Sequence, residues 1–359
     1  MDYRVYLPGI DEALVVELRG QVWGKDHPHT DSQFLQWILH ATPLGDGTGI
    51  LMSDNGTTVG FMGISPRLIV HDGKEYRAGH CMDLMVHPDF RSTLSSLRLV
   101  TECLETMKNL GYNCAYGFPN NNSYRLVTSP RCGYKWIFSP SLMVRPIGND
   151  SVSEDLAAWL PRLFRKLAGQ ALTSACSVWA ACAISKKPVG EVCLIDSFDA
   201  RFDDFWLKSQ KRSGISFKQD SAYLNWRFVG HPIYEYHKLA WLDGNEVKGY
   251  LITTKRELLG VPTTLIVDML TINNDSGIIR ELVKSALQVA IGDGSQLIAT
   301  QLLSTSSNYK LLKKLGFISV PQKFNPKQFN FVLHDLGQDA TILHNSQPWS
   351  FVWCDMDIV

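Results

Sequence analysis

The clearest pattern of hydrophobic and polar positions lies between residues 79 and 110. Alternating positions along 81–86 predict an extended strand, with Met82, Leu84 and Val86 on one face and Cys81, Asp83 and Met85 on the other. Pro88 cannot continue a strand ladder, and from Ser92 an apolar spacing of three and four predicts a helix to about Leu110. Small residues between a strand end and a helix leave free N–H groups at the positive end of the helix dipole, which is typical of an anion site.

The rest of the first 147 residues predicts a mixture of strands and helices. Two hairpins are indicated by Asp54-Asn55-Gly56 and by His71-Asp72-Gly73-Lys74, because these residue types suit tight turns. The other predicted elements are a strand at 3–7, a helix after Asp11, a short helix at 31–37, strands at 114–118 and around 133–136, and a helix after Asn120. The predicted order is β-α-α-β-β-β-α-β-α-β.

The second half of the chain repeats the first. Asp31-Ser-Gln-Phe-Leu-Gln-Trp37 matches Asp220-Ser-Ala-Tyr-Leu-Asn-Trp226, and Met82-Asp83-Leu84-Met85 matches Val267-Asp268-Met269-Leu270. Ordered matches of this kind predict a tandem duplication. We therefore expect an N-terminal domain at 1–147, a linker with an apolar helix at 148–189, and a C-terminal domain at 190–359 that ends in a strand-rich tail.

The apolar run at 167–184 contains Gln170, Thr173 and Ser174 and is marginal in length for a bilayer. We interpret it as a buried helix between domains rather than a membrane span. The tail from Phe329 to Val359 is apolar enough that we expect it to pack on the body of the protein.

Composition narrows the classes of protein. A chain of 359 residues predicts two domains, and a net charge of zero argues against nucleic acid or an anionic membrane as the main partner. The eight cysteines are scattered, with no Cys/His cluster at metal-binding spacing, so we expect no metal. The N-terminus does not resemble a signal peptide, and unpaired cysteines are typical of a reducing compartment, so we expect a cytoplasmic protein of open oligomeric state.

The segment Val86-His-Pro88-Asp-Phe-Arg91 and the loop after it resemble the GNAT acyltransferases (Gcn5-related N-acyltransferases). In that family a V-x-P-x-x-R/Q element ends the fourth strand, and an R/Q-x-x-G-x-G/A loop holds the pyrophosphate of coenzyme A. Here the loop reads Arg91-Ser-Thr-Leu94-Ser-Ser96, so both family glycines are replaced and Leu94 carries a side chain where backbone approaches the phosphate. The second half has no such element, so the resemblance assigns the phosphate to the first half.

The resemblance implies an α/β (α+β) fold of two tandem GNAT-like domains, each with a mixed, mostly antiparallel sheet flanked by helices. It also implies acyl-coenzyme A as donor, direct transfer to an amine, and a general base or a water chain that takes the amine proton. The cofactor-binding residues that follow from it are Met85, Val86, Arg91, Ser92, Thr93, Ser95, Ser96, Asn120 and Ser123. Asn120 and Ser123 are equally well explained as helix caps.

Asp83 is the first candidate for the base and His80 the second. Asp83 lies among apolar neighbours, where a carboxylate is costly unless it is paired. The alternative is a structural aspartate, which its counterpart Asp268 favours. The family often has a tyrosine four residues before the glycine that ends its last helix, but this chain has Ser129 there.

Three further motifs make the resemblance more specific. They are Gly117-Phe-Pro-Asn120-x-x-Ser123, Tyr223-Leu-Asn-Trp226-Arg227-Phe-Val-Gly-His231-Pro232 and Trp349-Ser-Phe-Val-Trp353-Cys-Asp355-Met-Asp357. Together they resemble the N-acyltransferases of bacterial surface-polysaccharide (O-antigen) synthesis, which act on nucleotide-linked amino sugars such as dTDP-3-amino-3,6-dideoxyhexoses. The resemblance implies Tyr223, Trp226 and Arg227 as substrate-binding residues. The alternative for all three is packing of the helix on the sheet, which the counterpart Trp37 favours for Trp226.

Two other functions stay open at this point. One is acylation of an amine on a peptide, an aminoacyl group or an antibiotic. The other is a GNAT scaffold that binds acyl-coenzyme A or a sugar without turnover, which the missing loop glycines favour.

Overall fold

The computed structural model describes residues 1–152, 162–181, 188–209, 214–258, 260–321, 329–344 and 348–356. The chain forms two compact units, and each unit takes residues from both halves of the sequence. Unit 1 consists of Met1–Ser139, Ser213–Ile233 and Phe329–Trp349, and unit 2 of Pro140–Arg212, Tyr234–Gln328 and Ser350–Val359. The compact units therefore divide the chain differently from the predicted boundaries near 147 and 190, which stay a prediction about the sequence repeats.

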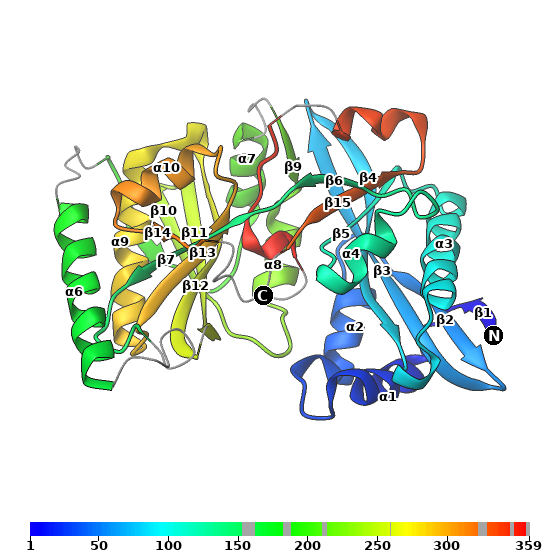
Figure 1. Cartoon of the computed structure of the whole chain (residues 1–359). Coiled ribbons are helices and arrows are strands. Elements are labelled where there is room, and N and C mark those ends of the chain that lie inside the picture. The colour runs from blue at the N-terminus through cyan, green and yellow to red at the C-terminus, as the bar shows by residue number, and fades with distance from the viewer. Residues whose placement is uncertain are drawn as a thin grey trace. The chain divides into compact units, whose positions relative to one another are not determined.

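Unit 1 follows the predicted element order (Figure 1). Its elements from the first half are β1 (Asp2–Val5), α1 (Glu12–Trp23), α2 (Ser32–His40), β2 (Thr48–Asp54), β3 (Thr57–His71), β4 (Lys74–Val86), α3 (Thr93–Asn109), β5 (Cys114–Gly117), α4 (Asn121–Val127) and β6 (Lys135–Phe138). Its elements from the second half are β9 (Ile215–Phe217), α8 (Ser221–Phe228) and β15 (Phe331–Asp335).

The sheet of unit 1 is mixed and mostly antiparallel, as predicted. Its strands run in the order β1-β2-β3-β4-β5-β15-β6, with β9 paired to β3. Among the described ladders between named strands of this sheet, only that of β4 and β5 is parallel. Both predicted hairpins are present, and their turns use positive φ at Asn55 and Gly56 and at Asp72 and Gly73, which these residue types tolerate.

Helices cover both faces of this sheet. Helix α3 packs its apolar face on one side, in a core cluster that includes Met62, Ile64, Leu99, Val100, Cys103 and Met107. Side chains of neighbouring β3 residues point to the other side, where Ser65 donates to the carbonyl oxygen of Ile38 in α2 at 2.6 Å. Successive side chains of β3 therefore point to opposite faces of the sheet, one covered by α3 and the other by α1 and α2.

Unit 2 repeats this architecture (Figure 1). Its elements are β7 (Ser141–Pro146), α6 (Arg162–Ala181), β8 (Glu191–Leu194), α7 (Ala200–Ser209), β10 (His237–Asp243), β11 (Glu246–Leu258), β12 (Val261–Thr271), α9 (Ser276–Gly292), β13 (Leu297–Leu302), α10 (Ser307–Lys314) and β14 (Ile318–Ser319). Its sheet has the order β14-β7-β13-β12-β11-β10-β8, and β12 pairs in parallel with β13 just as β4 pairs with β5.

The duplication is confirmed in detail, and the repeats exchange their last strands. Trp37 and Trp226 are 189 residues apart, and the same offset relates Arg67, which donates to Ser65 Oγ, to Arg256, which donates to Thr254 Oγ1. Strand β7, from the first half, lies in the sheet of unit 2 between β13 and β14. Strand β15, from the second half, lies in the sheet of unit 1 between β5 and β6.

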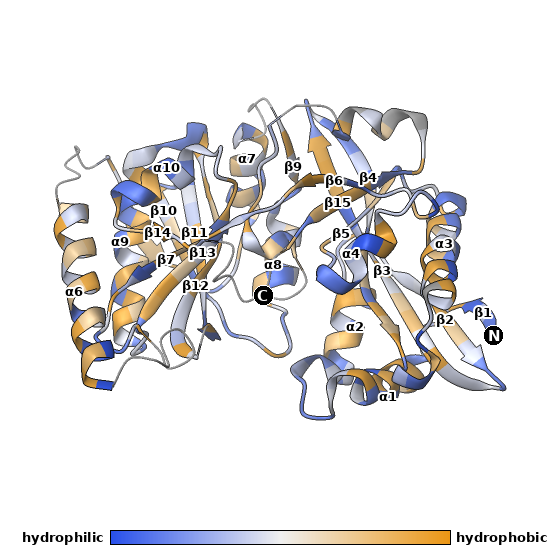
Figure 2. Ribbon diagram, in the orientation of Figure 1, coloured by the Kyte–Doolittle hydropathy of each residue, from blue (hydrophilic) through white to orange (hydrophobic). Residues whose placement is uncertain are grey.

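The apolar helix α6 differs from its prediction. It was expected to be buried, but in unit 2 only Gly169 and Cys176 on it are buried, while Leu163, Phe164, Leu167, Val178 and Trp179 are exposed. Figure 2 shows the apolar residues along this helix and its hydrophilic residues near one end. The apolar run predicted a helix, but the prediction that it is buried is wrong, because an apolar composition alone does not determine which residues meet the protein. Residues 182–184 of the predicted run lie outside the described residues.

The tail packs on the protein, as expected. Within unit 1 the Trp349 ring lies 4.9 Å from that of Phe331 and 5.8 Å from that of Phe138, measured between centroids. In unit 2 the Asp355 carboxylate accepts from the Val352 amide at 2.9 Å. Asp357 lies outside the described residues. No helix in the described part of the chain is both long and apolar enough to cross a membrane.

Candidate functional site

Strand β4 separates from β5 before it ends. The two strands are paired at Ala78↔Cys114, Gly79↔Ala115 and His80↔Tyr116, but β4 continues to Val86. On its other edge β4 stays paired with β3 up to Gly60↔Val86. In the described pairings, the β5 side of β4 is therefore open after His80, and its backbone N–H and C=O groups are free of the ladder there. This is the separation of strands that the resemblance implied.

A bulge in β4 lies in this open segment. The β3–β4 register passes from Gly63↔Met82 to Phe61↔Met85, so that Asp83 and Leu84 lie opposite the single residue Met62. Asp83 has φ of 53°, in the left-handed region that Asp tolerates better than most residues.

The bulge also changes which side chains share a face. The strict alternation predicted from the sequence is wrong for this strand. The additional residue of the bulge moves the side chains that follow it to the opposite face of the sheet. Cys81, Leu84 and Val86 all pack with the core cluster under α3.

Asp83 is held by a buried arginine. Arg19 of α1 donates from Nε to the Asp83 carboxylate at 3.1 Å and also pairs with it through Nη2. The Nη1 group of Arg19 donates to the carbonyl oxygen of His29 at 2.8 Å. Both side chains are nearly inaccessible, at 0% for Arg19 and 4% for Asp83. The ion pair ties the bulge of β4 to α1.

The counterpart of Asp83 in unit 2 is also paired within the protein. Tyr250 donates to Oδ2 of Asp268 at 3.1 Å. This arrangement agrees with the structural interpretation that the repeat favoured. The role of Asp83 as a base stays a prediction.

A cavity of about 810 Å³ adjoins the open end of β4. Its volume is within the range of about 300–1,000 Å³ that is common for small-molecule sites. It is lined by Val22, Trp23, Leu84, Met85, Val86, Arg91, Ser92, Ser96, Leu97, Asn120, Asn122, Ser123, Arg125, Leu126 and Ser129. The predicted cofactor-binding residues Met85, Val86, Arg91, Ser92, Ser96, Asn120 and Ser123 are thus brought together around one space.

The charge of this cavity is positive. Arg91 and Arg125 both line it, and none of the described lining residues is an aspartate or a glutamate. Arg91 donates from Nε to the carbonyl oxygen of Val86 at 3.1 Å, which fixes its guanidinium group beside the end of β4. Because guanidinium groups bind phosphate oxygens with two parallel hydrogen bonds, this wall suits an anionic ligand.

The N-terminus of α3 forms part of the same wall. Ser92 is the N-cap, and its Oγ accepts from the Ser95 amide at 3.0 Å and lies 2.5 Å from Ser95 Oγ. Ser95 is therefore used in capping and does not line the cavity, unlike its neighbours Ser92 and Ser96. Thr93 is the first residue of α3.

Leu94 does not obstruct the cavity. The replaced loop glycines predicted that this side chain would lie where the backbone approaches a phosphate. Instead it is 68% exposed and is not among the lining residues. The loss of the glycines therefore leaves the cavity open.

Asn120 caps a helix and also lines the cavity, and its role in cofactor binding stays a prediction. Its Oδ1 accepts from the amides of Asn122 at 3.0 Å and Ser123 at 3.1 Å, which caps α4, and the residue also lines the cavity. Helix α4 then carries Arg125 and Leu126 along the same wall. Ser129, at the position where the family often has tyrosine, lines the cavity as well.

His80 lies deep inside unit 1. It is 1% exposed, and its ring stacks on Tyr116 at 4.7 Å between centroids. Burial lowers the pKa of His80 well below its usual value, and the positive charges of Arg67 and Arg227 lower it further. The imidazole is therefore neutral at pH 7. Its Nδ1 has no hydrogen-bond partner among the described residues.

A thiol and a phenol meet next to the point where β4 and β5 separate. Cys81 Sγ lies 3.1 Å from the Tyr134 hydroxyl. Burial raises the pKa of Cys81 to about 12 and that of Tyr134 well above its usual value. Both groups are therefore protonated at pH 7, so Cys81 is not a thiolate nucleophile.

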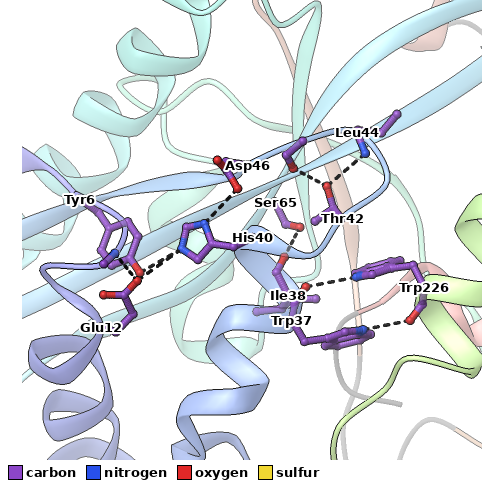
Figure 3. Close-up of polar contacts among 12 residues, drawn as sticks. Tyr6, Glu12, Trp37, Ile38, His40, Thr42, Leu44, Asp46, Ser65 and Trp226 are labelled. Atoms are coloured by element: carbon purple, nitrogen blue, oxygen red, sulfur yellow. Dashed lines mark hydrogen bonds and ion pairs between the residues drawn. The ribbon is translucent and has the colours of Figure 1, made fainter.

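The residues predicted to bind substrate lie on α8, in unit 1. Trp226 stacks on Trp37 at 4.8 Å, and each indole N–H donates to the backbone carbonyl of the other residue, at 2.9 and 3.1 Å (Figure 3). The guanidinium group of Arg67 lies 4.3 Å from the centroid of the Trp226 ring. Packing of the two repeated helices thus accounts for Trp226.

The other two predicted residues of α8 are also buried. Tyr223 is 7% exposed and Arg227 is 1% exposed. Their role in substrate binding, like that of Trp226, stays a prediction.

Sequence reasoning missed several residues of the cavity. The sequence did not indicate Val22 and Trp23, at the end of α1, or Asn122 and Arg125 of α4 as residues of a site. Helical spacing could have indicated Arg125, because Asn122, Arg125 and Ser129 follow one another at intervals of three and four residues and all line the cavity. The place of α1 depends on tertiary structure and has no local signal.

Two sheets of the same topology, each with one parallel pair of strands, define a tandem GNAT fold. No family model and no curated protein matches the sequence. The fold resembles that of a probable N-acyltransferase from Enterococcus faecalis V583, with a TM-score of 0.62 at 12% identity over 94% of this chain and 73% of that one.

Two further solved structures are similar. A GCN5-related N-acetyltransferase from Anabaena variabilis ATCC 29413 has a TM-score of 0.61 at 12% identity, over 94% of this chain and 73% of that one. The N-myristoyltransferase of Saccharomyces cerevisiae, with bound myristoyl-CoA, has a TM-score of 0.61 at 12% identity, over 92% and 82%. At these identities the similarity establishes the fold.

Proposed function

We propose that this chain is an N-acyltransferase that moves an acyl group from acyl-coenzyme A to an amine. The observation that carries the proposal is the cavity at the open edge of β4, lined by two arginines and by no acidic residue among those described. Coenzyme A is an anion with an extended amide-containing arm, so it needs both positive charge and unpaired backbone groups. The cavity is lined by Arg91 and Arg125 and adjoins the edge of β4 that does not pair with β5.

The arm and the phosphates of the donor would use different parts of this wall. Arg91, Arg125 and the N-terminal end of α3 would hold the pyrophosphate, because cations and free helix amides both attract phosphate oxygens. The pantetheine amides would pair with the open backbone edge of β4 near Met85 and Val86, as an additional strand does. The thioester carbonyl would then lie near the bulge.

Transfer in this site would be direct. The amine lone pair attacks the thioester carbon, and a backbone N–H at the open edge stabilises the charge that develops on the oxygen. The carbon–sulfur bond then breaks, and the thiolate of coenzyme A leaves and takes up a proton. His80 and Asp83 are the proposed acceptors of the amine proton, directly or through water. Asp83 already forms an ion pair with Arg19, whereas His80 is neutral, so His80 is the better placed of the two to accept a proton.

For the acceptor we propose a nucleotide-linked amino sugar of bacterial surface-polysaccharide synthesis. This part rests on the sequence motifs around Asn120, Tyr223–Pro232 and Trp349–Asp357. The competing acceptors are amines on peptides, aminoacyl groups and antibiotics.

Donor binding is tested by calorimetry with coenzyme A. Replacing Arg91 by alanine removes a charge-assisted phosphate contact worth about 1.5 kcal/mol at this exposed site, which corresponds to about tenfold weaker binding. We expect a similar loss for Arg125→Ala. The matched control is Arg98→Ala, because Arg98 is on α3 but pairs with Glu102 at 3.4 Å and does not line the cavity.

The acceptor is tested separately, by thiol release from acyl-coenzyme A with a panel of amino sugars, peptides and aminoglycosides. Turnover with a nucleotide-linked amino sugar alone supports the full proposal, and turnover with another amine corrects only the acceptor. Unchanged affinity in both arginine variants, or no binding of coenzyme A at all, would remove the donor site and the proposal with it.

A further inference from the structure

The cavity of unit 1 is lined from both faces of its sheet. Leu84, Leu97 and Leu126 line it and pack against the core cluster under α3. Val22 and Trp23 also line it, and they belong to α1, which covers the opposite face together with α2. The parallel ladder of β4 and β5 has ended at this point, so no paired strand separates the two faces there. The cavity therefore connects the α3 face with the α1 face.

The cavity has a cationic end and an aromatic end. Arg91 lies where β4 ends, because its Nε donates to the carbonyl oxygen of Val86 at 3.1 Å. Trp23 lies near the bulge instead: its ring centroid is 5.9 Å from the guanidinium carbon of Arg19, which pairs with Asp83. At about 3.3 Å per residue, Val86 and Asp83 are about 10 Å apart along the strand. This arrangement suits a ligand that is anionic at one end and apolar at the other.

Neighbouring side chains hold the indole ring of Trp23 in place. Its centroid lies 5.2 Å from that of the His27 ring and 6.3 Å from that of the His29 ring, in addition to the contact with Arg19. Trp23 and Val22 are each partly exposed. A ring that is held on several sides cannot turn aside without losing these contacts, so an additional methylene that meets it forces the packing apart, which is costly.

We propose that Val22 and Trp23 form an acyl subsite of this cavity, and that Trp23 limits the length of the acyl chain. The inference rests on the proposed function, in which the phosphates of the donor lie at Arg91 and its thioester lies near the bulge. The acyl group then continues away from the phosphates and meets α1. The donors that this subsite accepts are short-chain acyl thioesters, and the indole ring excludes long unbranched chains.

Binding of S-alkyl-coenzyme A thioethers tests the subsite without an acceptor and without turnover. Calorimetry with the full chain compares coenzyme A with its S-ethyl, S-butyl and S-decyl derivatives. We expect the S-ethyl and S-butyl forms to bind at least as tightly as coenzyme A, because they add apolar contact with the subsite. The S-decyl form should bind at least about tenfold more weakly than the S-butyl form, because methylenes that an apolar pocket cannot hold are rejected by about that factor or more.

Substitutions at the two residues should change this profile in opposite directions. Trp23→Ala should strengthen binding of the S-decyl form at least about tenfold, because the ring no longer occupies the space. Trp23→Phe keeps a smaller ring and should act in the same direction, so the test does not depend on the fold of the alanine variant. Val22→Phe should weaken the S-butyl form about tenfold, because it narrows the subsite.

Two controls accompany these variants. The affinity for coenzyme A without an alkyl group should stay within about threefold of the wild type in each of them, because the free thiol does not reach the subsite. The matched substitution is Trp136→Ala, since Trp136 on β6 is 54% exposed and does not line the cavity. It should keep the chain-length profile of the wild type.

The results distinguish a wrong subsite from a wrong donor site. If the Trp23 variants bind coenzyme A and keep the wild-type chain-length profile, the acyl subsite is overturned and the donor site stands. If Trp23→Ala unfolds near the wild-type temperature but loses affinity for coenzyme A itself, Trp23 contacts the cofactor and the subsite is again overturned. If the wild type binds neither coenzyme A nor any thioether, the proposed function fails and the subsite fails with it.

Discussion

The pair of Arg19 and Asp83 gives the sharpest prediction about β4. Replacing Asp83 by asparagine removes the charge but keeps the shape and the tolerance for φ of 53°. Arg19 would then be buried without its counter-ion, and loss of one partner from a buried pair costs about 3–5 kcal/mol. Arg19 keeps the His29 carbonyl oxygen at 2.8 Å as an acceptor, so we expect the lower end, about 3 kcal/mol.

Thermal unfolding of the full chain measures this loss. At about 2–4 °C per kcal/mol for a unit of this size, the transition of unit 1 should fall by about 6–12 °C. The matched control is Asp72→Asn, because Asp72 also has positive φ but its side chain is 72% exposed in a hairpin turn. That control should stay within about 0.5 kcal/mol of the wild type.

A second substitution tests the cause. Arg19→Met in the Asp83→Asn background removes the unpaired charge, so the double variant should be more stable than Asp83→Asn alone. If Asp83→Asn melted with the wild type and abolished turnover, Asp83 would be the base and the anchoring role would be refuted.

Two other predictions follow from burial and from the strand exchange. Burial lowers the pKa of His29 to about 4, so between about pH 6.5 and 4 the unfolded chain takes up a proton that the folded chain refuses. The free energy of unfolding should therefore fall by about 3 kcal/mol as the pH falls through this window. Urea unfolding at several pH values measures this fall. The fall should be smaller in His29→Phe, which keeps a ring stacked on Phe34 at 4.1 Å but cannot take up a proton. An unchanged pH dependence in that variant would contradict the assignment. A fragment of residues 1–147 lacks β15 between β5 and β6, so circular dichroism and gel filtration should find it unfolded or aggregated, and a folded monomer that binds coenzyme A would show that the exchanged strand is dispensable.

Local chemistry made much of the fold predictable. The residues at 54–56 and 71–74 favour positive φ, so both hairpins are apparent from the sequence. Asp31, Ser92 and Asn120 cap the helices that follow them, because their short polar side chains accept from the first helix amides. The same local signals placed Arg91 and Asn120 next to the end of a strand, and this is why the cavity wall could be predicted.

What the sequence could not provide depends on tertiary contacts. The bulge at Asp83 has no glycine to mark it, and the partner of Asp83, Arg19, lies 64 positions away. The exchange of β7 and β15 leaves no trace in hydrophobic alternation, because a strand has the same pattern in either sheet. The apolar composition of α6 predicted burial, and only the structure shows that Phe164, Leu167 and Val178 are exposed.

The central claim is that the opening between β4 and β5 in unit 1 receives the arm of an acyl thioester. A crystal structure with coenzyme A tests it most directly. We predict density for the pantetheine arm along the open edge of β4 at Met85 and Val86, with the pyrophosphate between Arg91 and the start of α3. Density for the cofactor in unit 2, or an opening that stays empty at saturating coenzyme A, would contradict the claim.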